Sequence, residues 1–188
     1  MTYLPHFIST VVVCGFILSF TARGGLVNDI ITAFGGKTIA FMSDPKWFRT
    51  IYVVTDIWQT VGWGSIIYLA ALSNINTELY EACVIDGGGR IRQMVAVTLP
   101  GIAPTIIVLL ILRMGRIMNV GLEKVLLLYN PVTYETADII QTFVYRKGLI
   151  ELNYSYSAAI GLFNSLINFI MLLIVNYISK KYSETSLW

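Results

Sequence analysis

The side chains that could do chemistry are few, and most of them lie inside apolar stretches. Asp56, Gln59 and Trp63 recur at helical spacing in one such stretch, and Arg113 and Arg116 lie three residues apart in another. A charged group inside a membrane span is costly, so it normally faces a protein interior or a water-filled cavity. Ion pairing and contact with a polar solute are therefore the chemistries that these residues favour.

Catalysis by the chain itself is not predicted. His6 is the lone histidine, and no second ligand lies at metal spacing, so no metal site and no nucleophile–base pair are expected. Cys14 and Cys83 give no disulfide framework. The sequence has no Gly-x-x-x-x-Gly-Lys-Ser/Thr loop to hold ATP phosphates, so no cofactor is expected either.

Composition places the chain in a membrane. Of its 188 residues, 56% are hydrophobic and only 13% are charged, whereas soluble domains carry roughly 25% charged residues. The mean hydropathy is +0.70. A net charge of +2 is too small to indicate binding to nucleic acid.

Four apolar stretches predict an all-α, polytopic helical membrane protein with about four spans, at residues 7–20, 51–72, 102–120 and 158–178. The first is short, and a cleaved signal peptide is an alternative for it, although no Lys/Arg-rich region precedes it. Residues 26–34 place their apolar side chains on one helical face, which predicts a helix lying flat on the membrane surface.

The intramembrane charges lie at similar depths. At about 1.5 Å per residue, Asp56 lies about 8 Å and Arg116 about 6 Å below the same end of their spans. We therefore expect Asp56 to pair with Arg116, or with Arg113 one turn deeper. Such a pair could line a polar path, or it could only lock two helices together.

A glycine-broken helix pair connects the second and third stretches. Asn76 can cap a helix that runs to Asp86, and Gly87 to Gly89 then stop it, because glycine takes positive φ without strain. A second short helix, at residues 90–97, is expected to end at Leu99-Pro100. The pattern predicts a bent pair of helices that projects from the membrane.

This connection resembles the EAA loop in the membrane subunits of binding-protein-dependent ABC importers, which have the MetI-like fold. The positions that match the pattern at the right spacing are Glu81, Ala82, Asp86, Gly87, Leu99 and Pro100, while Cys83 and Val97 replace its second Ala and its Ile. The resemblance implies that residues 76–100, Arg90 included, form a cytoplasmic coupling loop that contacts an ATPase subunit. The alternative is an amphipathic helix that merely lies on the bilayer.

The resemblance extends to a sugar-importing branch, the LplB-type permeases for oligosaccharides or polysaccharides. It is carried by Tyr3-Leu4-Pro5-His6-Phe7, by residues 63–68 and by the Leu187-Trp188 ending. A proline turn followed by a helix at residues 136–146 resembles the segment that faces the pathway or the binding protein. Because sugars pair an apolar face with a polar rim, the candidate path residues, besides the charged ones, are Gln59, Trp63, Tyr129, Asn130 and Asn164.

The partners that the resemblance implies are a cytoplasmic ABC ATPase dimer, which would bind the ATP, a second permease subunit, an extracytoplasmic solute-binding protein and membrane lipid. It also implies a multi-pass protein of a bacterial cytoplasmic membrane, with the coupling loop and the C-terminus in the cytoplasm. We interpret residues 1–188 as one partial transmembrane domain, because members usually have about six spans and the first two have no counterpart here.

Basic residues argue for the opposite orientation. The positive-inside rule places the loops with more basic residues in the cytoplasm. The coupling loop and the C-terminal tail hold four basic residues: Arg90, Arg92, Lys180 and Lys181. The loops on the other side hold seven, so the rule would put those loops inside: Arg23, Lys37, Lys46, Arg49, Lys124, Arg146 and Lys147. We give the motif precedence, because an ATPase must be met in the cytoplasm. A non-transporting membrane scaffold, a permease for a non-sugar solute and a membrane-embedded enzyme are the alternative functions.

Overall fold

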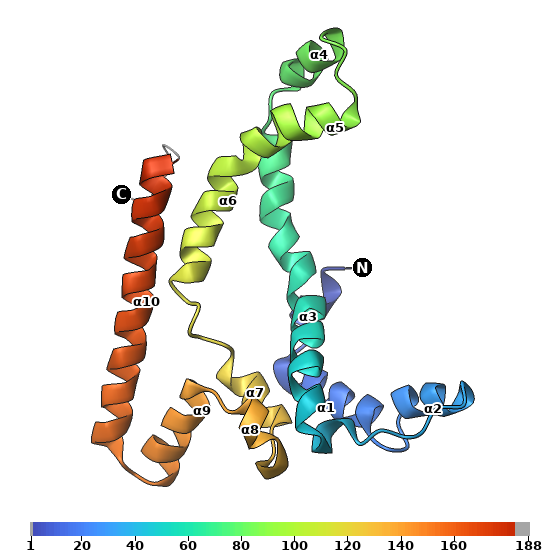
Figure 1. Cartoon of the computed structure of the whole chain (residues 1–188), viewed down its shortest axis with the longest axis vertical. Coiled ribbons are helices and arrows are strands. Elements are labelled where there is room, and N and C mark those ends of the chain that lie inside the picture. The colour runs from blue at the N-terminus through green and yellow to red at the C-terminus, as the bar shows by residue number, and fades with distance from the viewer. Residues whose placement is uncertain (1, 183–188) are drawn as a thin grey trace. The chain divides into compact units, whose positions relative to one another are not determined.

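The computed structural model describes residues 2–182, and every regular element among them is helical. The Leu187-Trp188 ending lies outside the described residues. The α-helices (Figure 1) are α1 (Thr10–Thr21), α2 (Leu26–Ala33), α3 (Pro45–Ser73), α4 (Thr77–Ile85), α5 (Arg90–Gln93), α6 (Leu99–Met114), α7 (Leu122–Leu128), α8 (Tyr134–Ala137), α9 (Ile140–Tyr145) and α10 (Tyr154–Tyr182). Short 3-10 helices cover Leu4–Phe7, Phe41–Ser43 and Pro131–Thr133, and π-helical turns cover Met94–Thr98 and Arg146–Ile150.

The chain divides into two compact units. Unit 1 comprises the described residues up to Trp63 together with Asn119–Leu162, and unit 2 comprises Gly64–Met118 together with the described residues from Phe163 onward. Helices α3 and α10 each begin in unit 1 and continue into unit 2.

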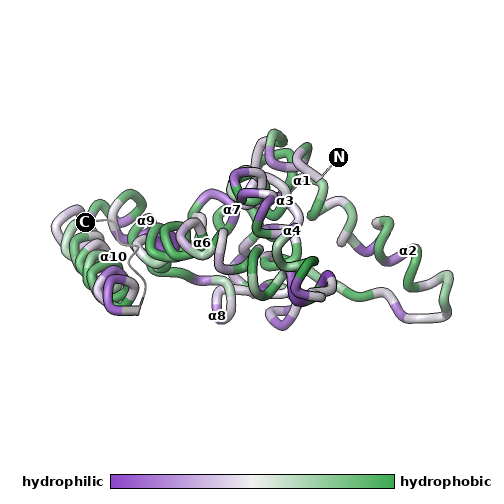
Figure 2. The backbone as a smooth tube through the Cα atoms, turned by 90° about the horizontal axis from the view of Figure 1, so that it is seen from above, coloured by the Kyte–Doolittle hydropathy of each residue, from purple (hydrophilic) through white to green (hydrophobic). Residues whose placement is uncertain are grey.

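Three helical segments in the described part of the chain are long and apolar enough to cross a membrane: Thr10–Ala33, Arg90–Met114 and Tyr154–Lys181. Figure 2 shows hydrophobic residues (green) along most of α10. Helix α3 has 29 residues and coincides with the second predicted span, but Asp56 and Gln59 make it more polar than the others. The all-α membrane fold is confirmed, and α2 forms a separate short helix where the interfacial helix was expected.

Unit 1 has the larger apolar core. Val13, Cys14 and Ile17 of α1 pack with Phe48 of α3 and with an apolar cluster from the later connection, made of Val125, Leu128 and Ala137. That connection was expected to hold one helix, at residues 136–146, but it also contains α7, which packs on α1. Its amphipathic heptapeptide at residues 122–128 supplies the apolar side chains that bury against α1.

Asn28 holds the C-terminal end of α1 and the loop after α2 together. Its side-chain amide donates to the carbonyls of Ala22 (2.8 Å) and Ile39 (3.0 Å), and its oxygen accepts from the Ile39 amide (2.8 Å). The residue is completely buried, and these three bonds meet the requirement that buried polar groups be paired. The sequence analysis did not single out Asn28.

Three expected helix boundaries were wrong. Helix α6 ends at Met114, not at residue 120, because Gly115 closes it. The single helix expected at residues 136–146 is divided into α8 and α9, because Asp138 takes an extended conformation and bonds Thr142 and Arg146 through its carboxylate. The consequence is that the segment after α6 is irregular and that the outer connection is more compact than a simple hairpin of helices.

The second coupling helix does not end at Leu99-Pro100. Helix α5 continues through a π-helical turn into α6, and within that turn the Leu99 amide bonds the Met94 carbonyl, five residues earlier. Pro100, which has no N–H to donate, directly follows this wider turn and lies at the start of α6. Residues 90–114 are thus one helical run.

Candidate functional site: a projecting helix pair and separate polar clusters

Helix α4 begins and ends as the sequence predicted. The Asn76 side chain accepts from the Glu78 amide (3.0 Å) and donates to the Glu78 carboxylate (3.0 Å), which caps the first turn. At the other end, the Gly88 amide bonds the Cys83 carbonyl (2.8 Å) and the Gly87 amide bonds the Val84 carbonyl (2.9 Å). These two bonds define a Schellman turn.

The three glycines after α4 are not equivalent. Gly87 has φ +75°, which other residues adopt only with strain. A Cβ on Gly88 would lie 2.6 Å from the Cys83 carbonyl oxygen and 2.5 Å from the Cys83 Sγ, so no side chain fits there. Gly89 has φ −76° and open space around it, so it could carry a side chain.

Helices α4 and α5 lie together at the end of unit 2 where α6 begins (Figure 1). We call residues 76–100 the coupling tip. All seven residues expected to contact an ATPase subunit are exposed on it: Glu81, Ala82, Asp86, Gly87, Arg90, Leu99 and Pro100. Ile85 is 85% exposed and Ile91 is 76% exposed, so the tip carries large apolar side chains that nothing in the described chain covers.

A single hydrogen bond between side chains links the two arms of the tip. The Tyr80 hydroxyl of α4 lies 3.0 Å from the Thr98 Oγ1 of the π-helical turn. Together with the Schellman turn, this contact fixes α4 against the helical run that continues into α6. The two arms of the tip are thus joined both by the turn and by this contact.

The partner expected for Asp56 was wrong. Its carboxylate lies 3.5 Å from the Nζ atom of Lys124 of α7, in unit 1, and the Lys124 ammonium also lies 5.0 Å from the Tyr52 ring centroid. The Lys124 side chain is only 5% exposed, whereas that of Asp56 is 40% exposed. Burial lowers the pKa of the Lys124 ammonium, and the nearby Asp56 carboxylate opposes that effect.

Tyr52 reinforces the same contact one turn away. Its hydroxyl donates to the Val120 carbonyl, next to Gly121, which has φ +87°. Helix α3 therefore contacts this part of the chain at two points: Tyr52 bonds Val120, just before α7, and Asp56 pairs with Lys124 of α7. The sequence analysis placed Lys124 in an outer loop and did not identify it as a partner.

Gln59 and Trp63, the other predicted path residues of α3, contact the N-terminal segment. The Gln59 amide nitrogen donates to the Ile8 carbonyl (3.3 Å). The Trp63 ring stacks on that of His6 with centroids 4.6 Å apart, and the Phe7 ring meets it edge-on at 5.7 Å. His6 therefore packs on an aromatic ring of α3.

Tyr129 and Asn130 also have structural partners in unit 1. Tyr129 packs against the core cluster and against the Tyr134 ring, 4.9 Å away. Asn130 caps the 3-10 helix at Pro131–Thr133 and donates to the Met42 carbonyl (2.7 Å). The turn expected at Asn130-Pro131 is thus present, and the Asn130 amide stabilises it.

Arg146 and Asp138 form the best-defined ion pair outside the spans. Two hydrogen bonds of 2.9 Å and 2.5 Å join them, and the Arg146 guanidinium lies 5.0 Å from the Tyr134 ring centroid. Hydrogen bonding to Arg146 holds the pKa of the Asp138 carboxyl below its usual range, and the same bond raises the pKa of Arg146. This pair, which sequence spacing alone did not reveal, orders α8 against α9.

The remaining predicted path residues belong to unit 2. Arg113 lies in the last turn of α6, Arg116 follows Gly115 in the next turn, and Asn164 lies on α10. The predicted path residues are thus divided between the units, with Asp56, Gln59, Trp63, Tyr129 and Asn130 in unit 1.

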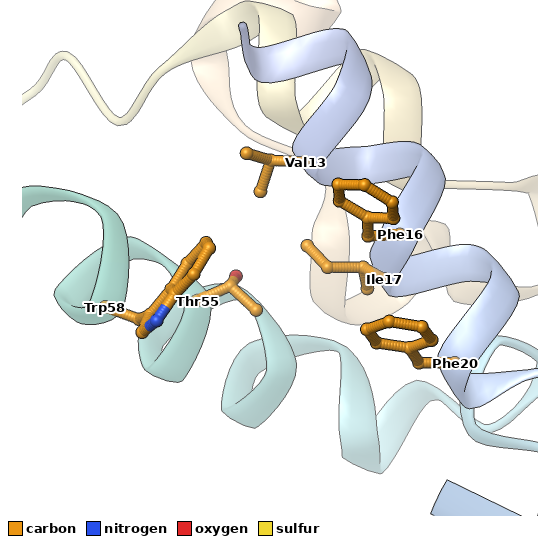
Figure 3. A pocket seen from close by; sticks show the side chains of 6 residues that line it. All are labelled: Val13, Phe16, Ile17, Phe20, Thr55 and Trp58. Carbon is orange, nitrogen blue, oxygen red and sulfur yellow. The ribbon is translucent and has the colours of Figure 1, made fainter. Parts of the chain in front are cut away.

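A pocket of about 210 Å³ lies between α1 and α3 in unit 1 (Figure 3). Its lining consists of Val13, Phe16, Ile17, Phe20, Thr55 and Trp58. The Thr55 hydroxyl donates to the Ile51 carbonyl (2.6 Å) within its own helix. The pocket therefore offers little hydrogen bonding to a sugar and is distinct from the polar clusters.

Comparison with known proteins identifies relatives over nearly the whole chain. Protein LplB of Bacillus subtilis (strain 168) is 46% identical over 187 residues, which cover 99% of this chain and 59% of LplB. The polygalacturonan/rhamnogalacturonan transport system permease protein YteP of the same organism is 43% identical over 191 residues, covering 100% of this chain and 59% of YteP. The chain thus spans about three fifths of the length of these curated relatives.

A solved structure has the same fold. One chain in the crystal structure of a bacterial alginate ABC transporter, in complex with an alginate pentasaccharide-bound periplasmic protein, matches with a TM-score of 0.96 and 43% identity, covering 99% of this chain and 65% of that chain. The family model described as "binding-protein-dependent transport system inner membrane component" matches residues 1–184. The chain therefore belongs to the family of inner membrane components of binding-protein-dependent transport systems.

Proposed function

We propose that this chain is the membrane-embedded part of an ABC importer permease that moves an oligosaccharide or polysaccharide into a bacterial cell. The observation that carries the proposal is the coupling tip, a Schellman-closed helix pair with exposed apolar side chains. Exposed apolar patches on a projecting element are typical of docking sites for another protein. The names of YteP and of the alginate transporter support a saccharide as the solute.

On this proposal the ATP is bound and hydrolysed by a partner ATPase dimer, and the chain itself is not an enzyme. The sequence contains no loop of the kind that holds ATP phosphates. Closure of the dimer would move the coupling tip, and the rigid connection through Tyr80 and the helical run 90–114 would pass that movement to α6. Rigid-body rocking of helices then opens the pathway to alternate sides.

The proposal sets the remaining partners and the orientation. A second permease subunit would complete the pathway, and an extracytoplasmic binding protein would deliver the saccharide. The coupling tip and the Lys180-Lys181 end of α10 would lie in the cytoplasm, and α2 and the α7–α9 segment would face outward. Three of the seven basic residues in those loops, Lys124, Arg146 and Lys147, form ion pairs. The positive-inside rule counts basic residues and not net charge, so the proposed orientation rests on the coupling motif and goes against that rule.

A charge reversal on the coupling tip tests the proposal in the complete importer, reconstituted in proteoliposomes. Glu81 is exposed on α4, so Glu81→Lys should leave the fold intact but place a wrong charge at the ATPase interface. We expect ATP-driven uptake of labelled oligosaccharide to fall at least about tenfold, with loss of the co-purifying ATPase subunit.

The matched control is Glu135→Lys, because Glu135 is also exposed but lies on α8 in unit 1. It should retain both uptake and ATPase binding. Equal behaviour of the two variants would refute the docking assignment, and a complete importer that takes up no saccharide would refute the proposed solute.

A further inference from the structure

Exposed, irregular backbone flanks helix α2 at both ends (Figure 1). Before the helix, the backbone at Ala22 is extended, and residues 22–24 are exposed. After the helix, residues 34–38 are exposed and belong to no regular element. Each flank also carries an exposed cation, Arg23 in the first and Lys37 in the second.

These features place both ends of α2 outside the hydrocarbon of the bilayer. Irregular backbone and cations are tolerated there only where protein buries them or where they border a water-filled cavity, and the described part of the chain covers neither flank. Helix α2 has 8 residues and is therefore about 12 Å long, whereas the hydrocarbon core is about 30 Å thick. Its two ends thus lie at the same face of the membrane, and the apolar segment Thr10–Ala33 turns along that face after α1.

Close packing and one buried amide hold α2 in this position. A Cβ on Gly25 would overlap the carbonyl oxygen of Ser19, so α2 starts directly against the last turn of α1. Asn28, which is completely buried, bonds Ala22 before α2 and Ile39 after it. The two flanks, and the cations in them, are therefore held beside α2 in one arrangement.

The remaining sides of α2 suit a helix that lies along a membrane surface. One side is apolar, and its residues, spaced four apart, are each more than half exposed: Leu26, Ile30 and Phe34. On the opposite side Asp29 and Thr32 are exposed. With Asn28 turned toward the protein, the helix thus has an apolar side for lipid and a polar side for water.

We propose that α2 and its flanks form a binding site for anionic phospholipids, in which the apolar side enters among the acyl chains and Arg23 and Lys37 bind the headgroups. Neither cationic side chain has an ion pair or hydrogen bond with a described residue. Amphipathic helices with basic residues bind anionic membranes in this way, and each Lys or Arg near an anionic surface strengthens binding about fivefold. The inference goes beyond the proposed function and holds for any transported solute.

Photo-crosslinking in the assembled importer tests this site. The importer is reconstituted in nanodiscs with equal amounts of phosphatidylglycerol, which is anionic, and phosphatidylcholine, which is zwitterionic, with identical acyl chains. A photo-crosslinking amino acid at position 34, or at position 32 on the opposite side of α2, captures the neighbouring molecules, and mass spectrometry identifies them.

The variants, each combined with the probe at position 34, are Arg23→Gln and Lys37→Gln. The matched control is Lys147→Gln. Lys147 is also a basic residue of unit 1, but its ammonium is already paired with the Glu151 carboxylate (2.7 Å), so it is not available to a headgroup.

We expect the probe at position 34 to crosslink to lipid and the probe at position 32 not to do so. At position 34, phosphatidylglycerol should exceed phosphatidylcholine at least about tenfold in wild type and in Lys147→Gln, and Arg23→Gln and Lys37→Gln should each reduce this excess about fivefold.

Lipid crosslinks from both positions would place α2 within the bilayer and overturn the inference. Crosslinks from position 34 to protein alone, or equal capture of the two lipids by wild type, would also overturn it. If Lys147→Gln reduced the excess as much as the other two variants, the preference would follow from net charge alone, and the proposed site would be refuted.

Discussion

Lys124 and Asp56 are unequal partners. Lys124 is buried to 5% side-chain exposure, and its ammonium lies over the Tyr52 ring, whereas the side chain of Asp56 is 40% exposed and so is less enclosed by the protein. Removing one member of a buried pair is costly because the other charge is left behind in a medium that cannot solvate it. The stability of the contact between α3 and α7 should therefore depend on which member is removed.

The prediction follows from this asymmetry. Asp56→Asn leaves a buried, uncompensated ammonium and should lower the free energy of unfolding by on the order of 2 kcal/mol. Lys124→Met replaces the ammonium by an apolar side chain of similar length and leaves the less enclosed member of the pair, so its effect should stay within about 1 kcal/mol. Thermal unfolding of the purified importer gives the order of the two, and a larger loss for Lys124→Met would contradict the pairing.

The predicted partner of Asp56 was wrong because two features of the fold have no signal in the sequence. The depth argument assumed that the third stretch stays helical to residue 120, but α6 ends at Gly115. It also treated Lys124 as a loop residue, because pairing across 68 residues of chain leaves no periodic signal. Asn76, whose partner Glu78 is only two residues away, was correctly predicted as a helix cap.

At the scale of elements, the coupling tip depends on one backbone turn. The Schellman bonds made by Gly87 and Gly88 determine where α4 ends and in which direction the chain leaves it. A side chain on Gly88 would meet the Cys83 carbonyl, whereas one on Gly89, the very next residue, would meet nothing. The three glycines thus provide a test with its control built into the sequence.

Gly88→Ala should break the bond between the Gly88 amide and the Cys83 carbonyl, at a local cost of about 1–3 kcal/mol, and reduce ATP-driven uptake. Gly89→Ala should change neither this hydrogen bond nor ATP-driven uptake. Hydrogen exchange of the amides at residues 87 and 88 measures the turn, and uptake measures its consequence. If both alanine variants behave alike, the orientation set by this turn is not what couples the tip to transport.

The sequence predicted this tip well and the outer connection poorly. The cap, the glycine stop and the helix from residue 77 follow from local rules that tertiary structure does not override. The break between α8 and α9 depends on Asp138 bonding Arg146 eight residues away, and the passage through Pro100 depends on a π-helical turn. Neither has a propensity signal in the sequence.

At the scale of the whole molecule, the account makes the membrane chain a passive transmitter driven by a motor outside it. Composition and the spacing of apolar stretches predicted the all-α membrane fold, and the glycine-broken loop predicted its family. The division into two units, with α3 and α10 passing through both, could not be read from hydropathy, because the helices continue without a break across the boundary.

The most direct test of the account places a photo-crosslinking amino acid at Ile85 in the assembled importer. Ile85 is 85% exposed on the coupling tip, and Phe34, 90% exposed at the end of α2, is the control, because the proposed orientation assigns α2 to the outer face. The account predicts that the probe at position 85 crosslinks to the ATPase subunit and that the probe at position 34 does not. Crosslinks from position 85 to lipid alone, or labelling of a cysteine there by a membrane-impermeant reagent added outside the cell, would contradict it.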